Sequence, residues 1–171
     1  MSRSLALVTT SAEETRSLAA SVAASLRAGD VVALAGDLGA GKTTFVQGAC
    51  AALGVDEPVL SPTFTLVRQY EGEVPVLHVD VYRLERLQDV LDLGFDEMVE
   101  AGGVVFVEWG DVIDSLLPES NLQVTITIPD EDDERRHLRV RACGTAWDER
   151  WTELAAAVGA WTDTAAAGEE G

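Results

Sequence analysis

Residues 36–43 read Gly-Asp-Leu-Gly-Ala-Gly-Lys-Thr, which fits the pattern G-x-x-x-x-G-K-[ST] of phosphate-binding loops. Lys42 is the only lysine of the chain, and the other eleven of its twelve lysine and arginine residues are arginines. A compact ammonium group can reach between phosphates as a point charge, whereas the planar guanidinium group is too wide for such a loop. The motif and the single lysine therefore predict that a nucleoside triphosphate binds here.

Each part of this loop has an expected role. The glycines of the motif let the backbone aim its N–H groups at phosphate oxygens, and the helix that follows adds its positive N-terminal end. We expect Lys42 to neutralise the β- and γ-phosphate oxygens, the Thr43 hydroxyl to ligate Mg²⁺, and Thr44 to contact the α-phosphate. The residues expected to contact the nucleotide are Gly36, Asp37, Leu38, Gly39, Ala40, Gly41, Lys42, Thr43 and Thr44.

The motif needs a strand before it and a helix after it. Residues 31–35, Val-Val-Ala-Leu-Ala, form a short apolar run that suits a buried strand. Residues 42 to about 53 predict a helix. The sequence thus supplies the strand–loop–helix context in which the motif binds phosphate.

Two carboxylates are candidates for the second half of a phosphoryl-transfer site, in which an acidic side chain stands at the end of a neighbouring buried strand. Glu108 follows the apolar run 104–107 and is the better match, while Asp80 follows residues 76–79. Either could cap a turn instead. Both have a role if one holds the metal and the other orients the attacking water, so Lys42, Asp80 and Glu108 are the predicted catalytic residues.

Three further residues lie close to these motifs in the sequence. Thr63, within Ser-Pro-Thr at 61–63, is placed where a switch loop could sense the γ-phosphate, although this sequence is also common loop chemistry. Trp109 follows Glu108 and would lie beside the nucleotide, or be buried in the core. His78 lies in a predicted strand, and we expect it to be a packed core residue.

The remaining pattern predicts an α/β fold with a P-loop NTPase-like sheet, mixed parallel and antiparallel, flanked by helices. We expect a single ATPase domain over residues 1–160 and a disordered acidic tail over 161–171. Ser11 and Glu14 form a capping box that opens a helix. The other expected elements are strands at 5–8, 64–70, 76–80, 104–108, 124–128 and 137–141 and helices at 84–91 and 147–158.

The charge of the chain limits its partners. Its formal net charge is -18 and no basic stripe offsets it, so we do not expect the chain to bind nucleic acid or anionic membranes by itself. No stretch is long and apolar enough to span a membrane, which predicts a cytoplasmic protein. Cys50 and Cys143 lack metal-ligand spacing and are expected to be free, buried thiols.

The base and the type of activity are open to alternatives. The guanine-specifying Asn-Lys-x-Asp motif cannot occur, because the only lysine is used in the loop, and this favours adenine. A small-molecule kinase would need arginines over the phosphates; Arg135 and Arg136 are the candidates, but the alternation of residues 135–141 predicts an exposed strand face. A third possibility is a binding module in which ATP only orders residues 61–65.

Four motifs occur together and in order: residues 36–44, 61–67 (Ser-Pro-Thr-Phe-Thr-Leu-Val), 78–84 (His-Val-Asp-Val-Tyr-Arg-Leu) and 108–110 (Glu-Trp-Gly). In this the chain resembles the bacterial TsaE (YjeE) family, ATPases of tRNA threonylcarbamoyladenosine biosynthesis, over roughly residues 11 to 144. Family members often have another residue than glycine at position 110, a departure with little consequence for a metal site.

The resemblance implies a function and a set of roles. It implies a protein that binds ATP and Mg²⁺, hydrolyses ATP slowly, and works with TsaB and TsaD, with tRNA contacted only through that complex. It further implies that Asp80 and Glu108 serve catalysis, that Thr43 and Glu108 ligate Mg²⁺, and that Arg136 lies at the edge of the nucleotide. Alone, the chain is expected to be a monomer.

Overall fold

A computed structural model describes residues 3–37, 39–61, 67–81, 87–108, 114–129 and 134–167. The nucleotide contacts expected at Leu38, Thr63 and Trp109 lie outside these residues. So does the departure from the family pattern at Gly110.

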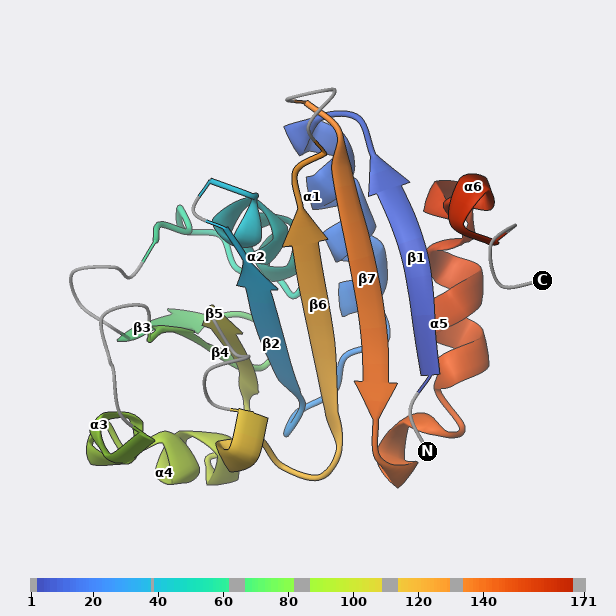
Figure 1. Ribbon diagram of the computed structural model, residues 1–171. Coiled ribbons are helices and arrows are strands. Elements are labelled where there is room, and N and C mark those ends of the chain that lie inside the picture. Colours follow the sequence, from blue (N-terminus) through green and yellow to red (C-terminus); the bar gives the residue numbers. More distant parts are fainter. Residues whose placement is uncertain are drawn as a thin grey trace.

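The described strands form one mixed sheet of seven strands in the order β1-β7-β6-β2-β5-β4-β3 (Figure 1). β2 pairs in parallel with β5 and β6, and β4 pairs in parallel with β5; the other neighbours are antiparallel. The strands are β1 (Arg3–Thr9), β2 (Val31–Gly36), β3 (Val67–Glu71), β4 (Pro75–Asp80), β5 (Val104–Glu108), β6 (Asn121–Thr127) and β7 (Arg136–Cys143).

Helices cover the sheet on both faces, and each layer has its own core. One core joins α1, α2 and α5 to the sheet, with Leu34 and Phe106 among its buried residues. The other joins α3 and α4 to the opposite face through Val31, Val79 and Val105. The described helices are α1 (Ala12–Ala23), α2 (Lys42–Ala52), α3 (Leu87–Asp92), α4 (Phe95–Glu100), α5 (Trp151–Ala157) and α6 (Thr164–Ala167), with single 3₁₀ turns η2 (Thr145–Trp147) and η3 (Gly159–Trp161).

Most expected elements are present, and the predicted α/β class with a mixed sheet is confirmed. The Ser11 hydroxyl accepts a hydrogen bond from the backbone N–H of Glu14 at 3.1 Å, so the predicted cap of α1 is confirmed. Helix α4 was not expected, and the single helix expected at 147–158 is divided into η2 and α5. Arg139 and Arg141 point outward from β7, as the alternation of its residues predicts.

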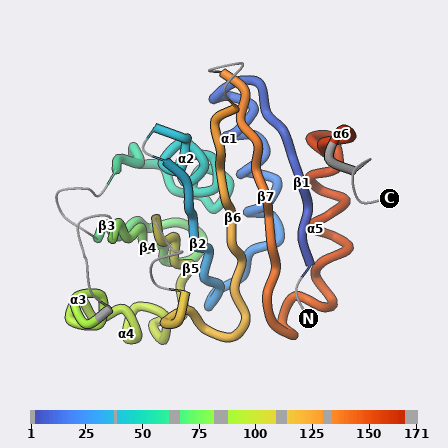
Figure 2. Tube along the Cα trace, viewed as in Figure 1, coloured from blue at the N-terminus to red at the C-terminus, as the bar shows by residue number. Residues whose placement is uncertain are grey.

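The C-terminal segment packs along the edge strand β1. Thr162 bridges to Leu7, and the Asp163 N–H donates to the carbonyl oxygen of Ala6 at 2.9 Å. The trace in Figure 2 shows β1 and the chain from α5 to α6 on the same side of the molecule, although they are far apart in the sequence. Disorder was expected from residue 161, but the structure describes a helical turn up to Ala167; residues 168–171 lie outside the described part.

Arg150 fixes this segment to the body of the protein. Its guanidinium group stacks on the Trp147 ring at 3.8 Å from the centroid and forms an ion pair with Asp30 at 2.5 Å. Arg150 is only 6% exposed, so its charge is neutralised inside the fold by a carboxylate that lies just before β2.

The two cysteines are free, as expected, but only Cys50 is fully buried; Cys143 is half-buried. Burial raises the pKa of the Cys50 thiol to about 12, so this thiol stays protonated at neutral pH and belongs to the core. No helix in the described ranges is long and apolar enough to cross a membrane.

Helices α1 and α2 approach closely at a glycine. A Cβ atom on Gly48 would lie 2.2 Å from the carbonyl oxygen of Arg16. At that distance the two atoms would clash, so any side chain at position 48 would require the backbone to move. This contact sets the position of α2, and with it the position of the phosphate-binding loop that precedes α2.

We therefore expect Gly48→Ala to lower the free energy of unfolding by about 1–3 kcal/mol through overpacking, even though alanine favours a helix by about 1 kcal/mol. Urea denaturation measures the effect. Gly159→Ala is the matched control, because a Cβ atom there meets nothing within 4 Å. An unchanged urea midpoint for Gly48→Ala would contradict the close approach of the two helices.

Candidate nucleotide site

The predicted phosphate-binding loop connects β2 to α2 and contains three glycines with positive φ. Gly39 (φ 81°) and Gly41 (φ 113°) adopt backbone conformations that other residues avoid, and a Cβ atom on either would point into open space. At Gly36, a Cβ atom would lie 2.4 Å from the carbonyl oxygen of Ile126 on β6. The first glycine therefore allows the loop to pack on the sheet, and the other two shape an open cradle.

Lys42 folds back over this cradle. Its side chain is 5% exposed, and Nζ donates hydrogen bonds to the carbonyl oxygens of Gly36 at 2.7 Å and Asp37 at 3.0 Å. These bonds to backbone carbonyls of the loop hold the ammonium group above the loop. A phosphate that enters the cradle would meet a positive charge that is already positioned.

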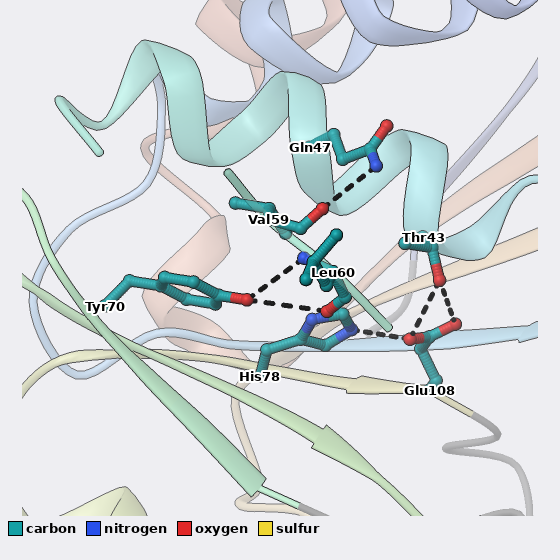
Figure 3. Close-up of polar contacts among 7 residues, drawn as sticks. All are labelled: Thr43, Gln47, Val59, Leu60, Tyr70, His78 and Glu108. Atoms are coloured by element: carbon teal, nitrogen blue, oxygen red, sulfur yellow. Dashed lines mark hydrogen bonds and ion pairs between the residues drawn. The ribbon is translucent and has the colours of Figure 1, made fainter. Parts of the chain in front are cut away.

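Thr43 and Glu108 meet at the mouth of the loop. The Thr43 hydroxyl lies 3.1 Å from Oε1 and 3.3 Å from Oε2 of Glu108, which is 4% exposed (Figure 3). They meet because β5 runs parallel to β2 and ends at the same edge of the sheet, where Glu108 pairs in register with Leu34. The structure thus brings together the two residues that the sequence suggested as a metal pair.

Asp80 stands beside Glu108. The two residues are direct partners in the parallel pairing of β4 with β5, and Asp80 is also 4% exposed. Because side chains alternate along a strand, Asp80 faces the same side of the sheet as Val76, which belongs to the core beneath α2. Both predicted carboxylates therefore face the start of α2.

His78 is part of this group, which the sequence did not indicate. It is fully buried, as expected, but its Nε2 atom lies 2.5 Å from Oε2 of Glu108, and its Nδ1 atom has no hydrogen-bond partner among the described residues. His78 precedes Asp80 by two positions, so the period of a strand places both on one face. That spacing was the signal available in the sequence.

Arg136 lies on the opposite side of the loop. Its Nε donates to the carbonyl oxygen of Ala40 at 2.9 Å, which ties the start of β7 to the loop. Beside it is a cavity of about 270 Å³ that also reaches the N-terminus of α1, whose residues were not expected at the site. The cavity is lined by Ser11, Ala12, Thr15, Gly39, Ala40, Gly41, Thr44, Glu134 and Arg136.

The chain that leads towards the expected switch loop is held at two points. The Gln47 side chain of α2 donates to the carbonyl oxygen of Val59 at 3.0 Å, and the backbone N–H of Leu60 donates to the Tyr70 hydroxyl at 3.2 Å (Figure 3). Ser61 is the last described residue before the gap. Val59 and Leu60 therefore lie next to α2 and β3.

The ligands available at the site indicate which kind of metal it suits. Among the described residues, no group of three or more His, Cys, Asp or Glu side chains could hold a metal ion. One hydroxyl and one carboxylate beside a phosphate cradle suit Mg²⁺, which retains waters and uses phosphate oxygens as ligands, rather than zinc.

The glycine-shaped loop between a buried parallel strand and a helix, with strand-end carboxylates beside it, defines a P-loop-like α/β protein. The crystal structure of YdiB from Bacillus subtilis superimposes with a TM-score of 0.77 at 37% identity, covering 91% of this chain and 96% of YdiB. The family model described as "Threonylcarbamoyl adenosine biosynthesis protein TsaE" matches residues 9–138.

The chain belongs to the TsaE family. Curated relatives support this over most of their length, and each is named "tRNA threonylcarbamoyladenosine biosynthesis protein TsaE". The relative from Bacillus subtilis is 42% identical over 147 residues, which is 85% of this chain and 90% of the relative. The relative from Streptomyces coelicolor is 41% identical over 138 residues, which is 77% of this chain and 93% of the relative.

The Thr43–Glu108 contact predicts a measurable effect on stability without any ligand. Thr43→Val removes the hydroxyl at nearly constant volume and leaves a buried carboxylate with one donor fewer, so we expect the free energy of unfolding to fall by about 1–2 kcal/mol. Thr43→Ser keeps the hydroxyl and is expected to stay within about 0.5 kcal/mol of the wild type. Equal stability of all three proteins in urea denaturation would show that the contact contributes nothing.

Proposed function

We propose that this protein binds ATP together with Mg²⁺, hydrolyses ATP slowly, and in this way serves the threonylcarbamoyladenosine modification of tRNA. The observation that carries the proposal is the contact between Thr43 and Glu108 at the mouth of a glycine-shaped loop that also holds Lys42. Membership of the TsaE family supports the pathway, since the relatives carry that modification in their names.

Different residues of the chain bind the phosphates, the metal ion and the attacking water. Backbone N–H groups of the loop and the N-terminus of α2 bind the phosphates, and Lys42 exchanges its bonds to the Gly36 and Asp37 carbonyls for phosphate oxygens. Thr43 and Glu108 hold Mg²⁺, which supplies charge neutralisation at the β- and γ-phosphate oxygens when it is bound. Asp80, adjacent to Glu108 on the same face, orients the attacking water.

The nucleoside is assigned to the cavity beside Arg136. That cavity opens directly from Gly39 and Thr44, so a nucleotide with its phosphates in the loop can extend into it. Adenine is favoured over guanine, because a chain whose only lysine is Lys42 cannot build the Asn-Lys-x-Asp motif.

TsaB and TsaD homologues are the proposed partners, in the cytoplasm, with this chain a monomer when alone. With a net charge of -18 the chain repels polyanions, so tRNA is held by the partners and this protein acts on the complex. ATP turnover then resets the complex between rounds of modification.

The catalytic assignment is tested by neutralising the two carboxylates. Glu108→Gln and Asp80→Asn are each expected to lower the kcat of Mg²⁺-dependent ATP hydrolysis about 100-fold or more, because a metal ligand and a water-orienting group each contribute on that scale. Glu153→Gln, an exposed position on α5, is the control and should leave the rate unchanged. If both site variants hydrolyse ATP like the wild type, the assignment is wrong.

The biological role is tested in cells that lack the protein. We expect the modified adenosine to disappear from tRNA, to return with the wild-type gene, and not to return with Lys42→Arg, since the wider guanidinium group does not fit over the loop. Arg139→Lys, the reverse exchange at an exposed position of β7, should restore the modification. Mass spectrometry of tRNA nucleosides measures the modified adenosine in all four strains: without the protein, with the wild type, and with each of the two variants. Persistence of the modified nucleoside without the protein would remove the proposed role.

A second candidate is a nucleotide-gated binding module at the same site. It is favoured by the attachment of Val59 and Leu60 to α2 and to Tyr70, directly before the expected switch loop. In that case Glu108→Gln, which is expected to bind ATP without hydrolysing it, would restore tRNA modification in cells as well as the wild type does.

A further inference from the structure

His78 and Glu108 form a close, buried polar contact at the site. His78 is 0% exposed and Glu108 is 4% exposed, and His78 Nε2 lies 2.5 Å from Glu108 Oε2. The contact runs diagonally across two parallel strands: His78 pairs in register with Phe106, and Glu108 is two residues further along β5. Both side chains thus stand on the face of the sheet that lies beneath α2.

The environment of the ring selects one protonation form. Nδ1 is buried and has no hydrogen-bond partner in the part of the chain that the structure describes, so a proton there would leave a buried N–H group unsatisfied, which costs about 1–3 kcal/mol. A bare Nε2 would also place its lone pair against the carboxylate oxygen. The form that fits is the neutral imidazole with its proton on Nε2, donating to Oε2.

A neutral donor suits a carboxylate that must bind a cation. Thr43 contacts both oxygens of Glu108 from α2, and His78 holds one of them from β4, so two elements fix the direction of the carboxylate. An arginine or lysine in place of His78 would neutralise the carboxylate and compete with a metal ion. The neutral imidazole orients Glu108 and leaves its charge available.

We propose that His78 is a positioning residue, whose neutral Nε2–H group holds the Glu108 carboxylate in the orientation that binds Mg²⁺ in the nucleotide complex. The inference rests on the proposed function, because it takes Glu108 as a ligand of Mg²⁺. It adds a residue that acts through Glu108 and does not touch the nucleotide. Outer-shell partners of metal ligands commonly contribute 10- to 100-fold in metal affinity.

The test compares nucleotide binding with and without the metal. The affinity of purified variants for a fluorescent ATP analogue is measured in EDTA and across a titration with MgCl₂. His78→Phe keeps a ring and removes the donor; we expect its half-saturating Mg²⁺ concentration to rise about 10- to 100-fold, while its affinity in EDTA changes less than about twofold. His78→Gln restores a neutral N–H donor and is expected to stay within about threefold of the wild type.

Phe106→Leu is the matched control for packing. Phe106 is the register partner of His78, is fully buried on the same face and has no polar side-chain atom. The Phe106→Leu variant should be less stable than the wild type, and its ATP affinity should depend on Mg²⁺ as that of the wild type does. An unchanged Mg²⁺ dependence in His78→Phe, or an equal shift in Phe106→Leu, would overturn the inference while leaving the proposed function in place. If the ATP affinity of the wild-type protein does not respond to Mg²⁺, both the inference and the proposed function are wrong.

A second measurement needs no variant and decides the matter if His78→Phe does not fold. The chain has only two histidines, so the ring ¹⁵N signals of His78 are assigned by comparison with the exposed His137. We expect these signals to show a proton on Nε2 of His78, as the contact with Glu108 requires. A proton on Nδ1 alone would show that the ring cannot donate to Glu108, and the positioning role would be wrong.

Discussion

A buried carboxylate joins three elements of this protein at one point. Glu108 ends β5, accepts a hydrogen bond from Thr43 at the start of α2, and meets His78 of β4. A carboxylate that is 4% exposed is stable there only because these partners satisfy it. The relative positions of the phosphate-binding loop and of the two acidic strand ends therefore depend on Glu108 being held from both sides.

The two halves of the sheet support the loop in different ways. The parallel strands β2, β5 and β4 bring their carboxyl ends to one edge, which is where open α/β sheets bind ligands. The strands on the other side of β2 hold the loop differently: β6, which is also parallel to β2, receives the backbone of Gly36, and Arg136 of β7 holds the Ala40 carbonyl. The loop is thus fixed along its length by a helix, a neighbouring strand and an arginine.

Local signals in the sequence were sufficient to predict where the loop and the two strand-end carboxylates lie in the fold. The glycines, Lys42 and the apolar runs that end in Asp80 and Glu108 each depend on a few neighbouring residues. The contact of His78 could not be found in this way, because it requires that β4 and β5 be adjacent, parallel and in the observed register.

Other expectations failed because they depend on contacts between distant residues, or because a helix was too short to recognise. The helix expected over residues 147–158 is interrupted where Arg150 forms its ion pair with Asp30, 120 positions away in the sequence. Helix α4 has only six residues and begins after Gly94, which has a positive φ, so its pattern was too short to recognise. Ser11 was expected only to begin a helix and Thr15 carried no expectation, since their place beside the loop follows from the packing of α1 on α2.

The packing of the C-terminal segment along β1 determines how short a fragment of this protein can be and still fold. The region that matches the family ends at residue 138, in the middle of β7, whereas buried Val140 and Ala142 lie beyond it. Leu154 and Val158 complete the same core, and residues 162–163 occupy the outer edge of β1. A fragment trimmed to residues 9–138 would lose all of β1 except Thr9 and most of β7, and it would expose a hydrophobic sheet and an unpaired strand edge. The unit that folds is therefore larger than the unit that carries the motifs.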